Sequence, residues 1–219
     1  MAIRVSYHRT VVKLLFLCSR RPGLGHSQYA AHLLERHAPL ALRHHASLRR
    51  YVLNVVEGED EIDSVNALYY DSLEDFELRN YDSTEGERIV VEDHARFLGG
   101  AAGYLTQESV IRDLEPKPVP GSRSPGVKWI CALRRPARLE SKLVPDLLTG
   151  PRGATYVAID RVERKLYDGG ADWDAFLEVR LASSEDAAPL RELIDAHCEA
   201  GAIWRVAEYV QRASGHAQS

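Results

Sequence analysis

The sequence predicts an α+β protein made of two similar units, each with the element order βαββαβ. The first observation is the segment 11–18, which is apolar except for Lys13. Its length and β-branched start are typical of a strand, and because it is apolar on both sides it must be covered on both faces. The second observation is the segment 114–125, which holds four prolines and is expected to be an extended, semi-rigid linker.

The third observation is that the sequence pattern restarts beyond this linker. Val12-Lys13 recurs as Val127-Lys128, and Arg20-Arg21-Pro22 recurs as Arg134-Arg135-Pro136. An internal duplication explains these echoes better than chance does. The predicted organisation is a first unit over residues 11–112, a linker over residues 113–125, and a second, degenerate unit over residues 126–212.

The elements of the first unit follow from apolar patterns and turn residues. Gly25 is an acceptable helix N-cap, and Pro39 can begin the second of two helical pieces that end near His45. A polar turn separates two strands and predicts a hairpin, and Gly99-Gly100 ends the last helix. The predicted elements are a strand over 11–18, helical pieces over 25–45, strands over 50–57 and 65–70, a helix over 73–98 with a break near 81–86, and a strand over 102–111.

The second unit repeats this order with weaker signals. Tyr156-Val157 is a counterpart of Tyr51-Val52, and a strand over 173–181 leads into a helix over 185–198. A strand over 203–210 closes the unit.

Composition limits the class of protein. The chain has 219 residues, a formal net charge of −4 and a sequence pI of about 6.1, so nothing indicates a nucleic-acid or anionic-membrane surface. We find no apolar run long enough to span a membrane and no signal peptide. The three cysteines lie far apart in apolar sequence, which suits reduced thiols and a cytoplasmic protein.

The stretch Glu35 to Leu40 carries the most unusual residue of the sequence, His37. His37 shares one helix face with Tyr29, Leu33 and Leu40, and His32 lies beside that face. Pro39 biases Ala38 away from helical dihedrals, so the helix is expected to end near His37. The negative end of the helix dipole would favour a protonated ring there, while burial would oppose it. Spacing alone leaves two interpretations open, a hydrogen-bonded core histidine and a functional one.

Several segments of the first half resemble the EthD family, within the dimeric α+β barrel superfamily. The segments that carry the resemblance are the strand 12–17, Arg20 to Leu24, the helix Tyr29 to Leu40, the strand 48–54, the segment 68–73 and the segment Asp93 to Phe97. The resemblance implies a ferredoxin-like unit whose sheet pairs face to face with another. Here the duplicated half can supply the second sheet, giving a pseudo-symmetric, eight-stranded barrel from one chain. A homodimer is also compatible with the resemblance.

The resemblance further implies a cofactor-independent enzyme of small-molecule metabolism, and secondary metabolism is the expected setting. Its relatives include polyketide cyclases, dehydratases and cofactor-free oxygenases that act on aromatic or polyketide-like molecules. On this basis we expect a lyase or cyclase that uses acid–base chemistry, with His37 and His32 as the catalytic residues. Substrate-binding residues are expected at Tyr29, Tyr51, Asn54 and Tyr69.

Two alternatives remain open at this point. One is a cofactor-free oxygenase that acts on an electron-rich phenol, and the other is a non-catalytic barrel that binds and shields a reactive intermediate. Leu53 and Val55 stand where the family often has polar residues, and Tyr69 stands where it often has tryptophan, so the barrel is expected to be largely apolar.

The second half offers no counterpart of His37 between Pro136 and Gly150, so a single site in the first half is expected.

His197 lies on an apolar helix face, and some haem enzymes of the superfamily take their axial histidine from the second half. A haem held by His197 is therefore a minor alternative to the absence of a cofactor. No metal-binding motif is present in the sequence, and no metal is expected.

Overall fold

The computed structural model describes residues 11–136, 139–149, 154–167, 169–181 and 188–212. Eight antiparallel strands form one closed barrel with the order β1-β3-β2-β8-β5-β7-β6-β4. The strands are β1 (Val12–Arg20), β2 (Arg50–Val56), β3 (Ser64–Tyr70), β4 (Leu98–Asp113), β5 (Val127–Arg134), β6 (Ala154–Lys165), β7 (Ala175–Leu181) and β8 (Glu199–Arg212).

The barrel is pseudo-symmetric. The first half contributes the order β4-β1-β3-β2 and the second half contributes β8-β5-β7-β6, in which each strand is replaced by its counterpart four strands later. The two halves join where β2 pairs with β8 and where β4 pairs with β6. This arrangement confirms the predicted α+β fold of two ferredoxin-like units in one barrel. The domain boundaries stay a prediction, because the two units share one closed sheet.

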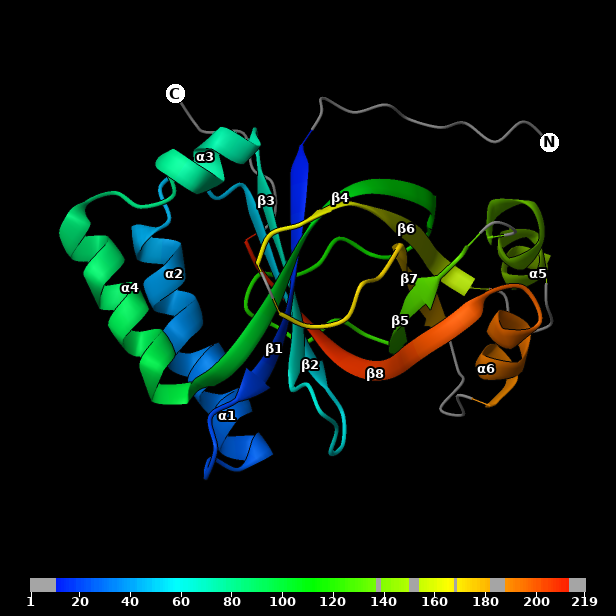
Figure 1. Ribbon diagram of the computed structural model, residues 1–219, viewed down its shortest axis with the longest axis horizontal. Helices are drawn as coiled ribbons and strands as arrows, with labels where there is room; N and C mark the ends of the chain where they lie inside the picture. The colour runs from blue at the N-terminus through cyan, green and yellow to red at the C-terminus, as the bar shows by residue number, and fades with distance from the viewer. Residues whose placement is uncertain (1–10, 137–138, 150–153, 168, 182–187, 213–219) are drawn as a thin grey trace.

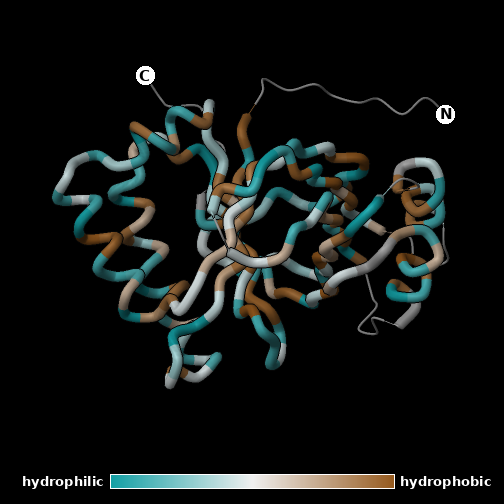
Figure 2. The backbone as a smooth tube through the Cα atoms, viewed as in Figure 1, coloured by the Kyte–Doolittle hydropathy of each residue, from teal (hydrophilic) through white to brown (hydrophobic). Residues whose placement is uncertain are grey.

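Helices cover the barrel on two opposite sides (Figure 1). The first half carries α1 (His26–His32), α2 (Ala38–His44), α3 (Leu73–Leu78) and α4 (Thr84–Phe97), and the second half carries α5 (Val144–Thr149) and α6 (Ala188–Asp195). Hydrophobic stretches gather along the central strands, whereas the helices alternate hydrophobic and hydrophilic turns (Figure 2). Among the described residues, no helix is long and apolar enough to cross a membrane.

Both faces of the strand β1 are apolar because both are buried. Leu15 and Leu17 point into the barrel and pack with strand residues of both halves. Leu14 and Cys18 point outward and pack under the helices of the first half. The strands of the second half therefore cover the inner face of β1, and the helices of the first half cover its outer face. A strand with one polar face would need only one of these covers. All three cysteines are free thiols.

The helix around His37 differs from the prediction. It continues through Pro39, and Ala38 keeps helical dihedrals of φ −59° and ψ −45°. A π-helical turn, Leu33–His37, joins α1 to α2, and the Ala38 N–H donates to the Leu33 carbonyl. The wider turn shifts the hydrogen-bond register just before the proline, which has no N–H to donate. The expected helix end at His37 is therefore wrong, and His37 lies inside a continuous helical segment, not at its negative end.

The proline-rich linker crosses one end of the barrel between β4 and β5. Its described residues form neither helix nor strand over 114–126. The Gly121 N–H donates to the Val210 carbonyl at 2.9 Å, and the Ser124 N–H donates to the Glu208 carbonyl at 2.8 Å. The linker is thus attached to β8 and lies over the barrel opening.

Candidate functional site

The predicted site residues are divided between the two faces of the first sheet. Tyr51 points outward, where it packs with Leu14 and Phe97 beneath the helices. Asn54 and Tyr69 point into the barrel and line a cavity at its open end. Neighbouring residues of a strand point to opposite faces, and the sequence alone could not tell which face was which.

Asp93, on α4, connects the two predicted catalytic histidines. Its Oδ1 lies 3.0 Å from Nε2 of His32, and its Oδ2 lies 3.1 Å from Nδ1 of His37. Nε2 of His37 lies 3.2 Å from Nε2 of His94. Phe97 stacks on the His32 ring with a centroid separation of 4.7 Å and also contacts the His37 ring. The helical segment of His37 and the helix α4 thus build one chain of polar groups in an apolar setting.

Electrostatics fix the protonation pattern of this chain. Burial raises the pKa of Asp93, but the hydrogen bonds from His37 and His32 outweigh it and bring the pKa to about 2. Asp93 is therefore ionised at neutral pH and accepts a hydrogen bond from each ring. Burial, reinforced by the charges of His37 and His45, lowers the pKa of His94 to about 4, which keeps His94 neutral.

This pattern leaves one nitrogen of His37 available for chemistry. Because Nδ1 of His37 donates to the Asp93 carboxylate, the neutral ring carries its lone pair on Nε2. That nitrogen faces His94. His37 can therefore accept a proton at Nε2, while the N–H of the neutral His94 ring can donate a hydrogen bond.

A pocket of about 540 Å³ opens beside the two rings, between the outer face of the first sheet and its helices. Aromatic side chains form much of its wall, and polar groups from β3 and from the helices complete it. The lining includes His37, His94, Phe16, Tyr51, Phe76, Tyr81, Tyr167, His45, Asn66 and Asn80. This volume lies within the usual range for small-molecule sites.

Asn66 is a further polar group of this pocket. Its side chain is 6% exposed, its Nδ2 donates to the Cys18 sulfur at 3.6 Å, and its Oδ1 has no partner among the described residues. A buried carbonyl oxygen without a donor is costly, so a hydroxyl or amino group of a ligand would satisfy it.

The two remaining predicted residues, Tyr29 and His32, lie next to the pocket but do not line it. Tyr29 is fully buried, its hydroxyl lies 2.7 Å from the Ser64 hydroxyl, and its ring packs on Phe97 at 5.4 Å. Tyr29 and His32 are absent from the pocket lining, so they position the site and do not form its wall.

Asp93, His94 and Asn66 were not predicted from the sequence. Asp93 and His94 lie in the segment that matches the EthD pattern, and this match was the available signal for them. Asn66 carried no signal, because its contribution depends on which face of β3 is covered by helices.

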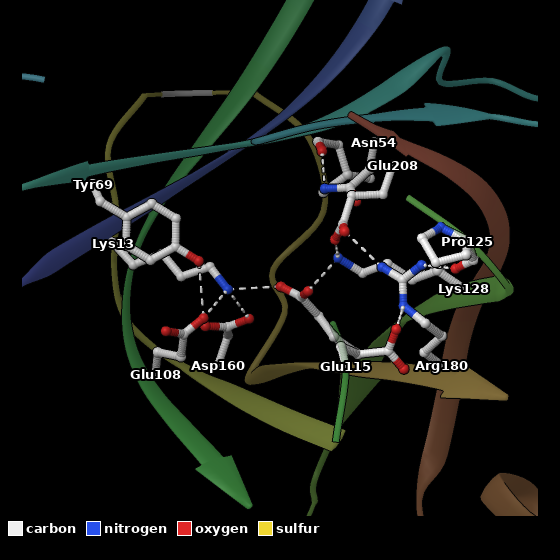
Figure 3. Close-up of polar contacts among 12 residues, drawn as sticks. Lys13, Asn54, Tyr69, Glu108, Glu115, Pro125, Lys128, Asp160, Arg180 and Glu208 are labelled. Atoms are coloured by element: carbon white, nitrogen blue, oxygen red, sulfur yellow. Dashed lines mark hydrogen bonds and ion pairs between the residues drawn. The ribbon is translucent and has the colours of Figure 1, made fainter. Parts of the chain in front are cut away.

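The barrel interior holds a separate polar network, shown in Figure 3. Nζ of Lys13, which is 1% exposed, lies 2.7 Å from Glu108, 2.8 Å from Asp160 and 2.6 Å from Glu178. Burial lowers the pKa of Lys13, but the three carboxyl groups outweigh it and raise the pKa well above its usual range. The carboxyl oxygens of these three residues lie within 4.8 Å of one another, but the Lys13 ammonium already lies among them as the cation. The expectation of a largely apolar barrel is therefore wrong.

The minor haem alternative does not fit the described residues around His197. Nε2 of His197 lies 3.2 Å from a carboxylate oxygen of Asp146, which lies in the first turn of α5. The layer between α5, α6 and the sheet is filled by buried apolar side chains, including Leu147, Leu190 and Ile194. His197 thus faces a neighbouring helix, and we derive no chemistry through a haem.

Comparisons with known proteins agree with this architecture. The EthD domain matches residues 21–101. No curated protein matches the sequence. An anthrone oxidase-like protein of known structure is 13% identical, with a TM-score of 0.62 over 97% of this chain and 99% of the other.

Two further solved structures have the same fold at similarly low identity. A candidate monooxygenase from Lactobacillus acidophilus NCFM is 9% identical, with a TM-score of 0.53 over 93% of this chain and 98% of the other. A mutant chlorite dismutase from Candidatus Nitrospira defluvii, in complex with cyanide, is 10% identical, with a TM-score of 0.54 over 90% of each chain. These identities establish the fold and no more. Residues 21–101 therefore match the EthD domain, as the sequence resemblance predicted, and the chain has the fold of the dimeric α+β barrel proteins.

Proposed function

We propose that the protein is a cofactor-independent enzyme that transfers protons on a small molecule bound beside His37. The observation that carries this proposal is the Asp93–His37–His94 chain at the wall of a pocket. An ionised carboxylate behind a histidine orients the ring and stabilises its protonated form.

In this mechanism His37 is the general base. A substrate whose acidic C–H or O–H group approaches Nε2 replaces the bond between His37 and His94. His37 then takes the proton, and Asp93 stabilises the resulting imidazolium. The N–H of neutral His94 donates to the oxygen on which negative charge develops, and return of the proton to another atom completes a dehydration or cyclisation.

The pocket supports an aromatic or polyketide-like substrate. Phe16, Tyr51, Phe76, Tyr81 and Tyr167 offer ring surfaces, and the volume of about 540 Å³ suits a molecule of more than one ring. Asn66 Oδ1 would accept a hydrogen bond from a substrate hydroxyl. We therefore expect a polyhydroxylated aromatic ligand, and we infer a lyase or cyclase.

A cofactor-free oxygenase is the second candidate, because two of the similar structures are described as an anthrone oxidase-like protein and a candidate monooxygenase. Its first step is the same proton removal. The electron-rich anion would then be oxidised by O₂, with one oxygen atom entering the product and the other leaving as water.

Hydrogen exchange on anthrone tests the shared first step. Under nitrogen in D₂O, the protein should accelerate exchange at the acidic CH₂ group of anthrone, and His37→Gln should reduce this rate by about 10²–10⁴-fold. A polyhydroxylated naphthalene and a β-diketone extend the test to other acidic substrates. Binding without acceleration for all three would favour a barrel that only shields a ligand. Oxygen uptake in air would then separate the two enzymes, since a lyase or cyclase consumes none.

A further inference from the structure

We propose that the open end of the barrel is a second ligand site, separate from the His37 pocket, for a small hydroxylated aromatic carboxylate. Arg50 would bind its carboxylate and Asn54 Oδ1 would accept from its hydroxyl. This inference does not rest on the proposed acid–base function, because the two sites lie on opposite faces of the first sheet.

The cavity at this end has a volume of about 360 Å³ and is closed on one side by the proline-rich linker. Strands of both halves contribute to its wall. Apolar surface comes from Val52, Ala67, Val210 and the rings of Tyr69 and Tyr156. The volume is near the lower end of the range for ligand pockets, so it suits a molecule with one ring.

Among the described residues, Arg50 is the partly buried cation of this cavity that pairs with no carboxylate, whereas Lys117 of the linker, which also lines the cavity, is exposed. Its guanidinium lies 5.0 Å from the Tyr69 ring centroid, and it forms no ion pair or side-chain hydrogen bond with the described residues. Lys128 pairs with Glu178 at 2.7 Å and with Glu208 at 2.5 Å. Arg180 pairs with Glu208 at 2.6 Å and with Glu115 of the linker at 3.5 Å. The neighbouring carboxylates are thus engaged by other cations, and the half-buried Arg50 keeps its capacity to bind an anion.

Tyr69, Glu108 and Glu208 raise the pKa of Arg50 through their charges, but neither carboxyl group forms an ion pair with it. Lys13 holds Glu108, Asp160 and Glu178 together (Figure 3). Burial and the neighbouring carboxylates outweigh the attraction of Lys13 and raise the pKa of Asp160 well above its usual range. The raised pKa favours the neutral form of Asp160.

Asn54 supplies the second recognition point. Its side chain is fully buried, and its Nδ2 donates to the Val65 carbonyl at 2.8 Å. That bond fixes which end of the amide is the oxygen, because reversing it would place two carbonyl oxygens together. Oδ1 has no partner among the described residues, and its neighbour across the β2–β8 pair is Glu208, another acceptor. The site therefore needs a donor such as a hydroxyl group.

The spacing of the two groups sets the kind of ligand. Arg50 and Asn54 lie four residues apart on β2 and both face the barrel, so their backbone positions are separated by about 13 Å. The Arg50 side chain spans part of this distance. An aromatic ring with a carboxylate at one end and a hydroxyl at the other would bridge the remainder, packed beside Tyr69 and Tyr156.

Titration calorimetry with 4-hydroxybenzoate tests the proposal. The full chain should bind one molecule, and benzoate and phenol, which each lack one recognised group, should bind more weakly. Arg50→Gln should weaken binding of 4-hydroxybenzoate by roughly 10- to 100-fold, the usual effect of losing a charge-assisted hydrogen bond. Arg49→Gln is the matched control, because Arg49 is exposed and pairs with Asp71, and it should leave binding unchanged.

Two results separate this site from the His37 pocket. His37→Gln should bind 4-hydroxybenzoate as the wild type does, and on the unmodified protein the ring protons of the ligand should show NMR contacts to the methyl groups of Val52 and Val210. The NMR measurement decides the question even if Arg50→Gln does not fold. The proposal is overturned by absence of binding at millimolar concentration, by equal binding to Arg50→Gln, or by contacts to Leu68 of the other pocket instead.

Discussion

His37→Gln is the sharpest perturbation of the proposed catalytic chain. Glutamine has a reach similar to that of histidine and can donate a hydrogen bond to Asp93, whose carboxylate lies 3.1 Å from Nδ1 of His37. Its carbonyl can accept from His94, which lies 3.2 Å from Nε2 of His37. What glutamine cannot do is take up and return a proton. The variant therefore keeps the contacts of a structural residue and loses the property needed for acid–base catalysis.

Two magnitudes distinguish a catalytic His37 from a structural one. If His37 transfers protons, turnover should fall by about 10²–10⁴-fold while the free energy of unfolding changes by less than about 1 kcal/mol. If His37 is only a core residue, the order reverses. An imperfectly satisfied buried partner would then cost about 1–3 kcal/mol of stability, with activity per folded molecule preserved.

The assay measures urea unfolding and anthrone hydrogen exchange on the same preparation. His44→Gln serves as the control, because His44 also pairs with an aspartate, Asp82 at 3.2 Å, but does not line the pocket. A control that lost as much exchange activity as His37→Gln would refute the assignment. So would a His37→Gln protein that is destabilised yet fully active.

Three further predictions concern other charged groups. The pKa of His94 falls from 6.5 in the unfolded chain to about 4 in the folded protein, so between these values the unfolded chain binds more protons. The free energy of unfolding should therefore drop by about 3 kcal/mol as the pH is lowered from 6.5 to 4. In acid titrations, His94→Gln should remove most of this loss. Asp93→Asn should lower turnover by about 10²-fold or more with little change in KM, because Asp93 lies behind His37; an unchanged kcat would exclude its positioning role. Lys13→Met should cost about 3–5 kcal/mol in urea unfolding, since it leaves buried carboxylates without their cation, whereas the exposed Arg88→Gln should cost less than about 1 kcal/mol.

The fold of this protein could be predicted from its sequence, by local patterns together with the resemblance to the EthD family. The apolar strand at 11–18 required cover on both faces, and the repeated segments beyond the linker indicated where that cover would come from. Both inferences rest on local patterns, which survive in any structure that buries the same apolar residues. The prediction that His37 and its neighbour His32 are catalytic also came from the sequence, through helical spacing and the resemblance to the EthD family, and it stays a prediction.

The tertiary structure alone decided how the site is composed. Asp93 joins His32 to His37 across two helices, a contact between residues far apart in the chain that no spacing rule encodes. It also decided which face each strand residue occupies, placing Tyr51 in the His37 pocket and Asn54 and Tyr69 inside the barrel. A strand pattern that is apolar on both faces carries no information about inside and outside, because period-two alternation assigns direction only when one face is polar. The closure of the barrel by the second half supplies that missing direction.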